Sequence, residues 1–294
     1  MSLADDPGVA QLIELARRED LGTGDVTSAL LPDAKKDARF QLTARQQGVF
    51  AGAEIASAVL KAYDPGIRIR WSEAGRDGEE IRSSPVTLAT LEGPLDALLA
   101  AERVLLNFLQ RLCGIATLTW EFVEAVAGTG AKIYDTRKTV PGWRLLDKYA
   151  VRCGGGRNHR FGLYDAVLTK DNHIHGQATR PLAGVIFEMF NSLGPERDHL
   201  SFVAVEARDV EDVEELMKVV GVDVIVLDNF FVSDLRRAVA IRDKLGLRGK
   251  VALEASGGIG LDNVRAVAQT GVERISVGAL THSAPALDLA LERV

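Results

Sequence analysis

The residues best suited to chemistry lie between positions 131 and 175, where basic side chains are concentrated. This window holds nine Lys or Arg and four Asp, a local charge of +5, whereas the whole chain of 294 residues has a formal charge of −6. The residues outside the window therefore sum to −11. Because the cations lie beside Gly, Asn, His and apolar runs rather than at helical spacing among Glu, we interpret the window as an anion-binding pocket and not as a solvated face.

Short apolar runs follow one another through the second half of the chain, and each ends in a polar or glycine tip. Helical stretches at 211–221, 233–246 and 261–271 separate the later runs. This alternation is typical of parallel strands covered by helices, and it predicts a small α/β barrel of six or seven units. Since active sites of such barrels lie at the carboxyl ends of the strands, the tips would meet at one mouth. The tips are Asp135, Lys170, Glu206, Asp228, Ser256 and Gly278.

The first two strands would bring five basic side chains to this mouth. Arginine offers a planar fork that matches a carboxylate or a phosphate, and lysine offers a compact charge suited to phosphate. A histidine among them could donate to an anion or move a proton near neutral pH. The five candidates are Arg137, Lys138, His159, Arg160 and Lys170.

The later tips carry complementary groups. Glu206 and Asp228 could bind sugar hydroxyls or a magnesium ion, whose preferred ligands are oxygens, or they could only neutralise the neighbouring cations. Glycine turns after the last two strands would let backbone N–H groups approach a phosphate. These turns, with the histidine after the second, comprise Ser256, Gly257, Gly258, Gly278, Ala279 and His282.

Composition disfavours several classes of function. The acidity of the chain argues against a nucleic-acid partner, and no apolar run approaches the ~20 residues of a membrane span. Cys113 and Cys153 make no disulfide framework, and we expect both to be small buried groups. Together with an acidic, amphipathic first segment unlike a signal peptide, they predict a reducing, cytoplasmic setting.

Two local patterns that could suggest cofactors are weak. His173 and His175 with Asp171 lack a third ligand at zinc spacing. The glycine run at 154–156 lacks the preceding strand that a dinucleotide fingerprint needs.

The first 112 residues predict a separate α/β domain. A helix at about 8–19 precedes a strand-rich segment at 37–92, and a long helix with a buried leucine stripe follows at 96–112. Arg103 lies on another side of that helix, where an ordinary solvated arginine is the simpler interpretation. We therefore expect an N-terminal domain at 1–112 and a barrel domain at 113–294, whose last residues could return to the first domain.

Long motifs in a fixed order resemble one known family. They are DTRKT (135–139), PGWRLLDKYAVRCGGGRNHRFGLYD (141–165), KDNHI (170–174), VLDNF (226–230), LEASGGI (253–259) and ISVGALTHS (275–283), with GTGDVTS (22–28) and ERVLLNFLQRLCGIAT (102–117) nearer the N-terminus. Over nearly the whole chain they are similar to quinolinate phosphoribosyltransferase (nicotinate-nucleotide pyrophosphorylase, carboxylating).

The resemblance implies an N-terminal open α/β sandwich, an incomplete, seven-stranded-like α/β barrel, and a homodimer or larger oligomer. It implies quinolinate, phosphoribosyl pyrophosphate (PRPP) and Mg²⁺ as ligands. The products would be nicotinate mononucleotide, pyrophosphate and CO₂, in the de novo biosynthesis of NAD. Carried over by position, Arg137, His159 and Arg160 would hold quinolinate, and Lys138 and Lys170 would lie between the two substrates.

The resemblance also implies roles for the remaining positions. Glu206 and Asp228 would face the ribose hydroxyls and the magnesium ion, directly or through water, and would be catalytic together with the two lysines. Arg103 matches an arginine that members of the family insert into the neighbouring subunit's site. The implied substrate-binding set is completed by Ser256, Gly257, Gly258, Gly278 and His282 at the phosphate end, and by Thr136, Val277 and Ala279.

Two positions depart from the family pattern. Ala204 stands where relatives commonly carry an additional Glu, so one carboxylate near the implied metal site is missing. Trp143 replaces a usually smaller residue after the Pro-Gly turn. Neither change removes an implied catalytic group.

Three alternatives stay open. Nicotinate phosphoribosyltransferase acts on a monocarboxylate, for which a pocket with several arginines would leave buried donors unpaired. A molybdenum-transport-associated homologue is disfavoured because the DTRKT, NHR and KDNH motifs are intact. The third is a non-catalytic phosphate-metabolite-binding protein, or a barrel aldolase that uses Lys170 as a Schiff-base amine.

Overall fold

The computed structural model describes residues 3–174 and 181–294. The chain divides into two compact units that share its segments unevenly. Unit 1 comprises residues 1–120, 139–155 and 280–294, and unit 2 comprises residues 121–138 and 156–279. Among the described residues, no helix combines the length and the apolarity needed to cross a membrane.

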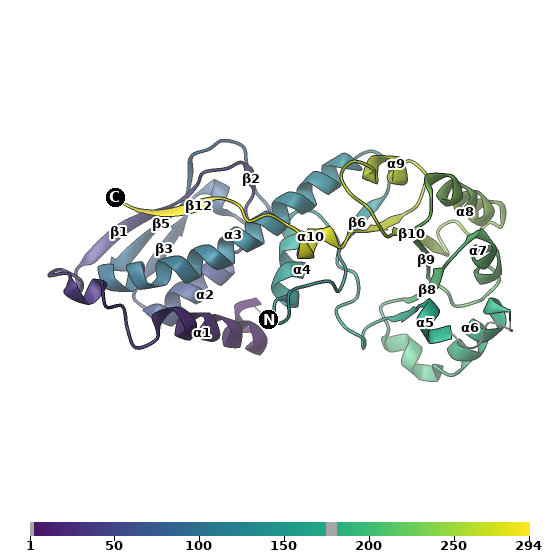
Figure 1. Ribbon diagram of the computed structural model, residues 1–294, viewed down its shortest axis with the longest axis horizontal. Helices are drawn as coiled ribbons and strands as arrows, with labels where there is room; N and C mark the ends of the chain where they lie inside the picture. The colour runs from purple at the N-terminus through teal and green to yellow at the C-terminus, as the bar shows by residue number, and fades with distance from the viewer. Residues whose placement is uncertain (1–2, 175–180) are drawn as a thin grey trace. The chain divides into compact units, whose positions relative to one another are not determined.

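Unit 1 contains a four-stranded antiparallel sheet in the order β12-β1-β5-β3. Its strands are β1 (Asp37–Ala44), β3 (Arg68–Trp71), β5 (Val86–Pro94) and β12 (Leu289–Arg293), and a small second pair is formed by β2 (Gly48–Val49) and β4 (Glu80–Ile81). Figure 1 shows β12, in yellow, beside β1 as the outermost strand of the sheet. The last strand of the described chain, β12, thus completes the sheet by pairing with the first strand, β1.

Helices α1 (Pro7–Leu21) and α2 (Ala53–Tyr63) accompany this sheet. The Asp6 carboxylate accepts hydrogen bonds from the backbone N–H groups of Gly8 and Val9, a side-chain cap that starts α1 close to the predicted position. Helix α2 lies inside the segment predicted to be strand-rich, in a stretch for which no element was predicted. The backbone N–H groups of the N-cap residue Gly52 and of the first helical residue Ala53 donate to Oδ1 of Asp77 at 2.7 and 3.0 Å. Because the capping residue Asp77 lies 24 positions after Ala53, the residues next to the start of α2 do not predict the cap.

The long helix α3 runs from Leu95 to Ala125, well beyond the predicted end at Leu112. Thr117 and Thr119 lie within this extension, and each hydroxyl donates to the carbonyl four residues earlier at 2.7 Å, which gives the side chain a partner without breaking the helix. Gly114 is required because a Cβ there would lie 1.9 Å from the carbonyl oxygen of Pro285. A glycine that looks like a helix stop is therefore a site of close backbone approach.

Unit 2 is built on six parallel strands in the order β6-β11-β10-β9-β8-β7. They are β6 (Lys132–Tyr134), β7 (Val167–Thr169), β8 (Val203–Ala207), β9 (Val224–Asp228), β10 (Ala252–Ser256) and β11 (Arg274–Ser276). Within the described residues, β6 and β7 form the two edges and the barrel is not closed. This confirms the predicted incomplete α/β barrel, with six paired strands in place of seven.

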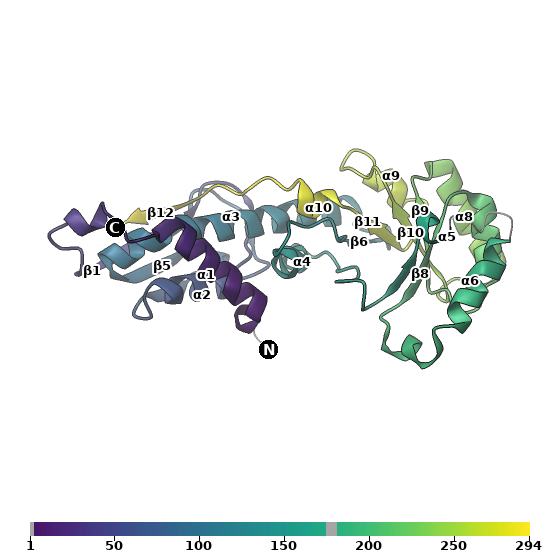
Figure 2. The ribbon, with the colours of Figure 1, turned by 60° about the horizontal axis from the view of Figure 1, so that its bottom comes forward.

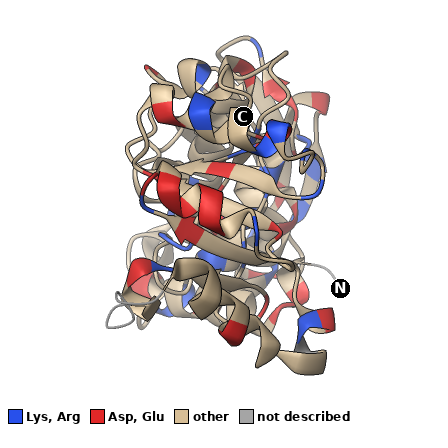
Figure 3. Ribbon diagram, turned by 90° about the vertical axis from the view of Figure 1, so that its right-hand side faces the viewer, with Lys and Arg blue, Asp and Glu red and all other residues tan. Residues whose placement is uncertain are grey.

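Helices follow the later strands as the alternating pattern predicts. They are α5 (Asp171–Ile174), α6 (Leu182–Asn191), α7 (Val210–Leu216), α8 (Val232–Lys244) and α9 (Val264–Ala268), while α4 (Arg144–Cys153) follows the edge strand β6 and α10 (Ala279–His282) follows β11. Helices α6 and α8 lie on the same side of β8 and β9 (Figure 2). Acidic residues are concentrated in α7, which has four in its sequence VEDVEEL, whereas α8 has more basic than acidic residues; Figure 3 shows acidic residues in red and basic residues in blue.

The register of the parallel strands sorts side chains into rows on one face, which we call the site face. Its first row is apolar, with Leu168, Ala204, Val224 and Ala252 paired across β7 to β10. Its second row, two residues further along, is formed by Glu206, Val226, Glu254 and Arg274. Its third row contains Asp228 and Ser256. Polar and charged groups thus increase toward the carboxyl ends of the strands.

Candidate active site

Asp135 organises the first part of the site at the end of β6. Its side chain is completely buried. Its carboxylate accepts hydrogen bonds from the backbone N–H of His159 at 2.8 Å and from Nδ2 of Asn158 at 2.6 Å. Residue Arg157 also forms a parallel bridge with Tyr134. The segment 157–160, which follows a long excursion of the chain, is therefore fixed against the end of β6. Sequence reasoning named Asp135 as a strand tip but not this positioning role.

Arg137 and Arg160 bring two like charges together. Burial is the main cause that lowers the pKa of the Arg160 guanidinium, and the neighbouring charge of Arg137 adds to it. Nη1 of Arg160 donates to the carbonyl of Ala166 at 3.1 Å. Nη1 of Arg137 is buried and has no hydrogen-bond partner among residues 3–174 and 181–294. Buried polar groups are normally paired, so this arrangement is suited to an anionic ligand that brings acceptor oxygens.

Lys170 and Glu206 form a direct ion pair between the ends of β7 and β8. The Lys170 side chain remains 45% exposed, whereas that of Glu206 is nearly buried. The next turn is closed by His173, whose Nδ1 accepts from the backbone N–H of Lys170 at 2.9 Å. His173 thus has a local structural partner, and His175 lies outside the described residues.

The tips of β9 and β10 pack tightly on each other. The Asp228 carboxylate accepts from Nδ2 of Asn229 at 2.8 Å, and the backbone N–H of Asn229 donates to the carbonyl of Ser256 at 2.8 Å. Asn229 and Gly257 both have positive φ angles, +56° and +89°. A Cβ at Gly257 would lie 2.1 Å from Oδ1 of Asn229, so the turn after β10 requires glycine. Nδ2 of Asn263 then donates to the carbonyl of Gly258 at 2.9 Å and shapes the rest of the loop.

His159 is held through both ring nitrogens. Its Nδ1 accepts the backbone N–H of Arg160 at 2.8 Å, and its Nε2 lies 3.4 Å from Oε1 of Glu254. The ring meets Phe202 edge to face, with centroids 5.0 Å apart. Glu254 in turn accepts from Nε of Arg274 at 2.5 Å. Although burial alone would raise the pKa of Glu254, the hydrogen bonds and charges of His159 and Arg274 hold it below the ordinary value.

Glu254 and Arg274 are the residues of this site that sequence reasoning missed. The available signal was a charged residue within each of two otherwise apolar strands, VALEAS and ERISVG. Strands buried on both faces rarely contain unpaired charges, so two such residues on adjacent strands suggest a buried pair.

The remaining predicted residues are distributed over both units. Thr136 Oγ1 accepts from the backbone N–H of exposed Lys138 at 3.0 Å, and the backbone N–H of buried Val277 donates to Tyr134 at 2.9 Å. Gly278 and Ala279 are half-buried at the end of unit 2. Arg103 and His282 are exposed and belong to unit 1.

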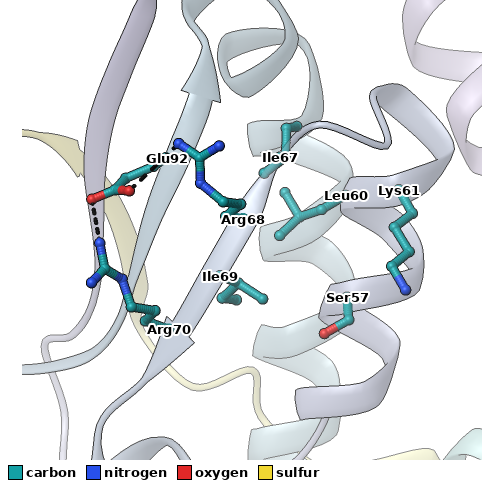
Figure 4. Close-up of a pocket in the computed structure, with 8 residues that line it drawn as sticks. All are labelled: Ser57, Leu60, Lys61, Ile67, Arg68, Ile69, Arg70 and Glu92. Carbon is teal, nitrogen blue, oxygen red and sulfur yellow. Dashed lines mark hydrogen bonds and ion pairs between the residues drawn. The ribbon is translucent and has the colours of Figure 1, made fainter.

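A separate pocket of about 510 Å³ lies in unit 1 between α2 and β3 (Figure 4). Its two arginines point toward Glu92, with Nη2 of Arg70 at 2.7 Å and Nη2 of Arg68 at 3.7 Å from its carboxylate. It contains none of the predicted site residues. Its lining residues are Ser57, Leu60, Lys61, Ile67, Arg68, Ile69, Arg70 and Glu92.

Comparison with known proteins adds independent information. A family model described as the quinolinate phosphoribosyl transferase C-terminal domain matches residues 115–292, and the corresponding N-terminal domain model matches residues 25–113. A probable nicotinate-nucleotide pyrophosphorylase (carboxylating) of Bacillus subtilis is 39% identical over 93% of this chain and 89% of its own. The chloroplastic nicotinate-nucleotide pyrophosphorylase (carboxylating) of Arabidopsis thaliana is 40% identical, over 96% and 81%.

Solved structures agree with these relatives. The nicotinate-nucleotide pyrophosphorylase of Francisella tularensis superposes with a TM-score of 0.87 and 35% identity, over 100% of this chain and 99% of that one. A human nicotinic acid phosphoribosyltransferase superposes with a TM-score of 0.56 but only 14% identity, a likeness of fold alone.

Proposed function

This chain belongs to the quinolinate phosphoribosyltransferase family, and we infer that it catalyses the decarboxylating transfer of phosphoribose from PRPP to quinolinate. The products are nicotinate mononucleotide, pyrophosphate and CO₂, a step of de novo NAD biosynthesis. The observation that carries the assignment of substrate to site is the Arg137–Arg160 pair. Two neighbouring guanidinium groups, one with a buried nitrogen that has no partner in the described part of the chain, are matched by a ligand with two carboxylates.

Electrostatics also explain the other charged residues of the site. Both substrates are polyanions, so their approach requires concentrated positive charge, which Lys138 and Lys170 add between them. Lys170 is already oriented by Glu206. Departure of pyrophosphate leaves an oxocarbenium-like sugar, and the pyridine nitrogen of quinolinate attacks its anomeric carbon. Positioned charges can supply most of the rate acceleration of such a transfer without a protein nucleophile.

Decarboxylation follows from the product of that attack. The ribosylated ring nitrogen is cationic, and it stabilises the electron pair left on the adjacent carbon when the neighbouring carboxylate departs as CO₂. A proton from water or from a nearby lysine then binds to that carbon in place of the departed carboxylate. The pair of arginines holds the remaining carboxylate during this step.

We propose Mg²⁺ as the resident ion, held by Glu206 and Asp228 directly or through water. The two carboxylates lie on adjacent strands, in the second and third rows of the site face. Oxygen donors of this kind fit magnesium, which usually keeps several waters and takes further oxygens from substrate phosphates. When bound, the ion would neutralise charge on the pyrophosphate leaving group.

Product analysis tests the assignment directly. Purified protein with magnesium and PRPP is given either quinolinate or nicotinate. We expect nicotinate mononucleotide only from quinolinate, with one CO₂ per nucleotide. Product from nicotinate would identify a salvage activity instead, and absence of product from either substrate would refute phosphoribosyl transfer and leave the phosphate-metabolite-binding protein and the aldolase as the alternatives.

Substitution of either arginine by alanine should weaken quinolinate use selectively. Loss of one charged hydrogen-bond partner commonly costs on the order of 2–4 kcal/mol, a fall of roughly 30- to 900-fold in kcat/KM for quinolinate. Arg237→Ala, which removes an exposed arginine of α8 paired with Asp234 at 3.4 Å, is the matched control and should leave kcat/KM unchanged. Near-normal kinetics in both Arg137→Ala and Arg160→Ala would remove these residues from the site.

We further propose a homodimer in the cytoplasm in which Arg103 completes the neighbouring subunit's site. The support is the family match and the exposed position of Arg103 on α3. Arg103→Ala and Lys138→Ala proteins should each be inactive alone and should partly recover activity after mixing. No recovery, with subunit exchange verified by differently tagged chains, would refute the shared site.

A further inference from the structure

A charged pair lies deep in unit 2, on the second row of the site face. Glu254 is 1% exposed and Arg274 is its register partner on the next strand. Their side chains meet at 2.5 Å, and the Arg274 guanidinium stacks over Tyr134 at 3.9 Å from the ring centroid. Burying two charges costs several kcal/mol per ion before pairing, and an apolar pair of similar size is often no less stable. Fold stability alone therefore gives no reason for this pair.

The pair leads directly to the substrate-binding arginine. Glu254 receives Arg274 on Oε2 and faces Nε2 of His159 with Oε1. Nδ1 of His159 accepts the backbone N–H of Arg160, so this nitrogen has no proton and the ring proton lies on Nε2. Phe202 fixes the ring from the side. Each link in the series Arg274, Glu254, His159, Arg160 is thus a contact between neighbouring groups.

We propose that Glu254, anchored by Arg274, is a positioning residue for quinolinate binding: it fixes the ring and tautomer of His159, which in turn holds the backbone from which Arg160 reaches the substrate. The proposal rests on the proposed function. It gives His159 a role in addition to the one the family resemblance implies. Its two ring nitrogens contact the backbone of Arg160 and the carboxylate of Glu254, so the ring also holds Arg160 in place.

The first measurement does not depend on activity. The chain has five histidines, and ¹⁵N-labelled histidine with a His159→Gln protein for assignment reports the ring nitrogens of His159 individually. At neutral pH the intact protein should show His159 with an unprotonated Nδ1 and a protonated Nε2. A proton on Nδ1 in the wild-type protein would overturn the proposal, whatever the enzyme does.

The second measurement uses Glu254→Gln, which keeps the size of the side chain and removes its charge. We expect the His159 resonances to change and KM for quinolinate to rise about tenfold, the usual scale for one charge-assisted hydrogen bond, with KM for PRPP changing less than about twofold. The matched control is Glu80→Gln, which removes the charge of an exposed glutamate paired with Arg82 in unit 1. It should leave the His159 signals and both KM values unchanged.

Glu254→Gln leaves Arg274 buried with a neutral partner, so the double variant Glu254→Gln/Arg274→Met is made in parallel, since it retains no unpaired charge. It should fold and should show the same selective rise in KM for quinolinate. Unchanged His159 signals and an unchanged KM in a folded variant would refute the positioning role. Equal rises in KM for both substrates would also refute it, since they indicate a general loss of structure. If wild-type protein does not turn over quinolinate, the proposed function fails first, and the tautomer measurement still decides the His159–Glu254 contact.

Discussion

Removal of Arg111 should destabilise unit 1 strongly, because it strands a buried charge. Asp147 on α4 has a completely buried side chain, and Arg111 on α3 binds it with Nε at 3.1 Å and Nη2 at 2.9 Å. Nη2 also donates to the carbonyl of Thr281 at 3.1 Å. The guanidinium lies 5.4 Å from the ring centroid of Trp143, which stacks on Phe108. One arginine therefore joins α3, α4 and α10.

The magnitude follows from the burial of the two partners. Breaking a buried ion pair by removing one partner costs about 3–5 kcal/mol. The Arg111 side chain is 26% exposed, so solvent screening places Arg111→Met near the lower end, about 3 kcal/mol. For a unit of roughly 150 residues this corresponds to a fall in Tm of about 6–12 °C. Urea unfolding followed by tryptophan fluorescence is a suitable assay, since Trp143 lies in the affected cluster.

Two further variants separate a stranded charge from a simple loss of contacts. Arg82→Ala removes an arginine that is 83% exposed and paired with Glu80 at 3.1 Å, and it should cost less than about 1 kcal/mol. Arg111→Met/Asp147→Asn removes both charges and should recover about half of the loss seen in Arg111→Met. If the double variant were as unstable as the single one, or if Arg111→Met cost no more than Arg82→Ala, the reasoning from buried charge would be refuted.

Two other predictions concern the turn after β10 and the cysteines. Gly257→Ala should raise KM for PRPP at least tenfold, because its Cβ would displace Asn229, the neighbour of Asp228. Gly246→Ala, with φ +66° and open space around its Cβ, should leave KM unchanged and cost only about 1–2 kcal/mol of stability; equal kinetics in the two variants would refute a steric role. Burial raises the pKa of both Cys113 and Cys153 to about 12. The contribution of these two thiols to the free energy of unfolding is complete below the unfolded thiol pKa of about 8.5. It declines as pH rises toward 12, because over this range only the unfolded chain releases the thiol protons. Urea unfolding of the wild-type and the Cys→Ala proteins from pH 8 to 11 should show a steeper decline in the wild type, and parallel declines would contradict it.

The sequence predicts unit 2 well, because strands buried on both faces must be apolar and must end where the chain turns polar. Each of the six predicted tips lies within or directly after an observed strand, or two residues beyond it in the case of Gly278. Unit 1 is predicted less well for a physical reason. Helix α2 depends on a cap from Asp77, and α3 passes through Gly114 because Pro285 approaches it. Both determinants come from residues far away in the sequence.

The site shows the same division between local and distant determinants. Basic residues that outnumber the acidic residues around them, such as Arg137 and Arg160, can be recognised from the local composition of the sequence. The groups that orient them are carboxylates that are paired in the fold, such as Asp135 and Glu254. A residue of this kind does not give the surrounding sequence an unusual local charge, so composition does not reveal it. Sequence reasoning therefore finds what contacts an anionic ligand more readily than what holds those contacts in place.

The row order of the site face clarifies the departure at Ala204. This residue lies in the first, apolar row, where it packs with Val224 and Val226 and is fully buried. Glu206 lies in the second row and contacts Lys170, and Asp228 lies in the third. A glutamate at 204 would therefore lie one row deeper than the two carboxylates proposed for magnesium, among apolar side chains. Because the first row lies farther from the mouth than the second and third, Ala204 leaves the proposed magnesium ligands in place, and its effect falls on the packing beneath them.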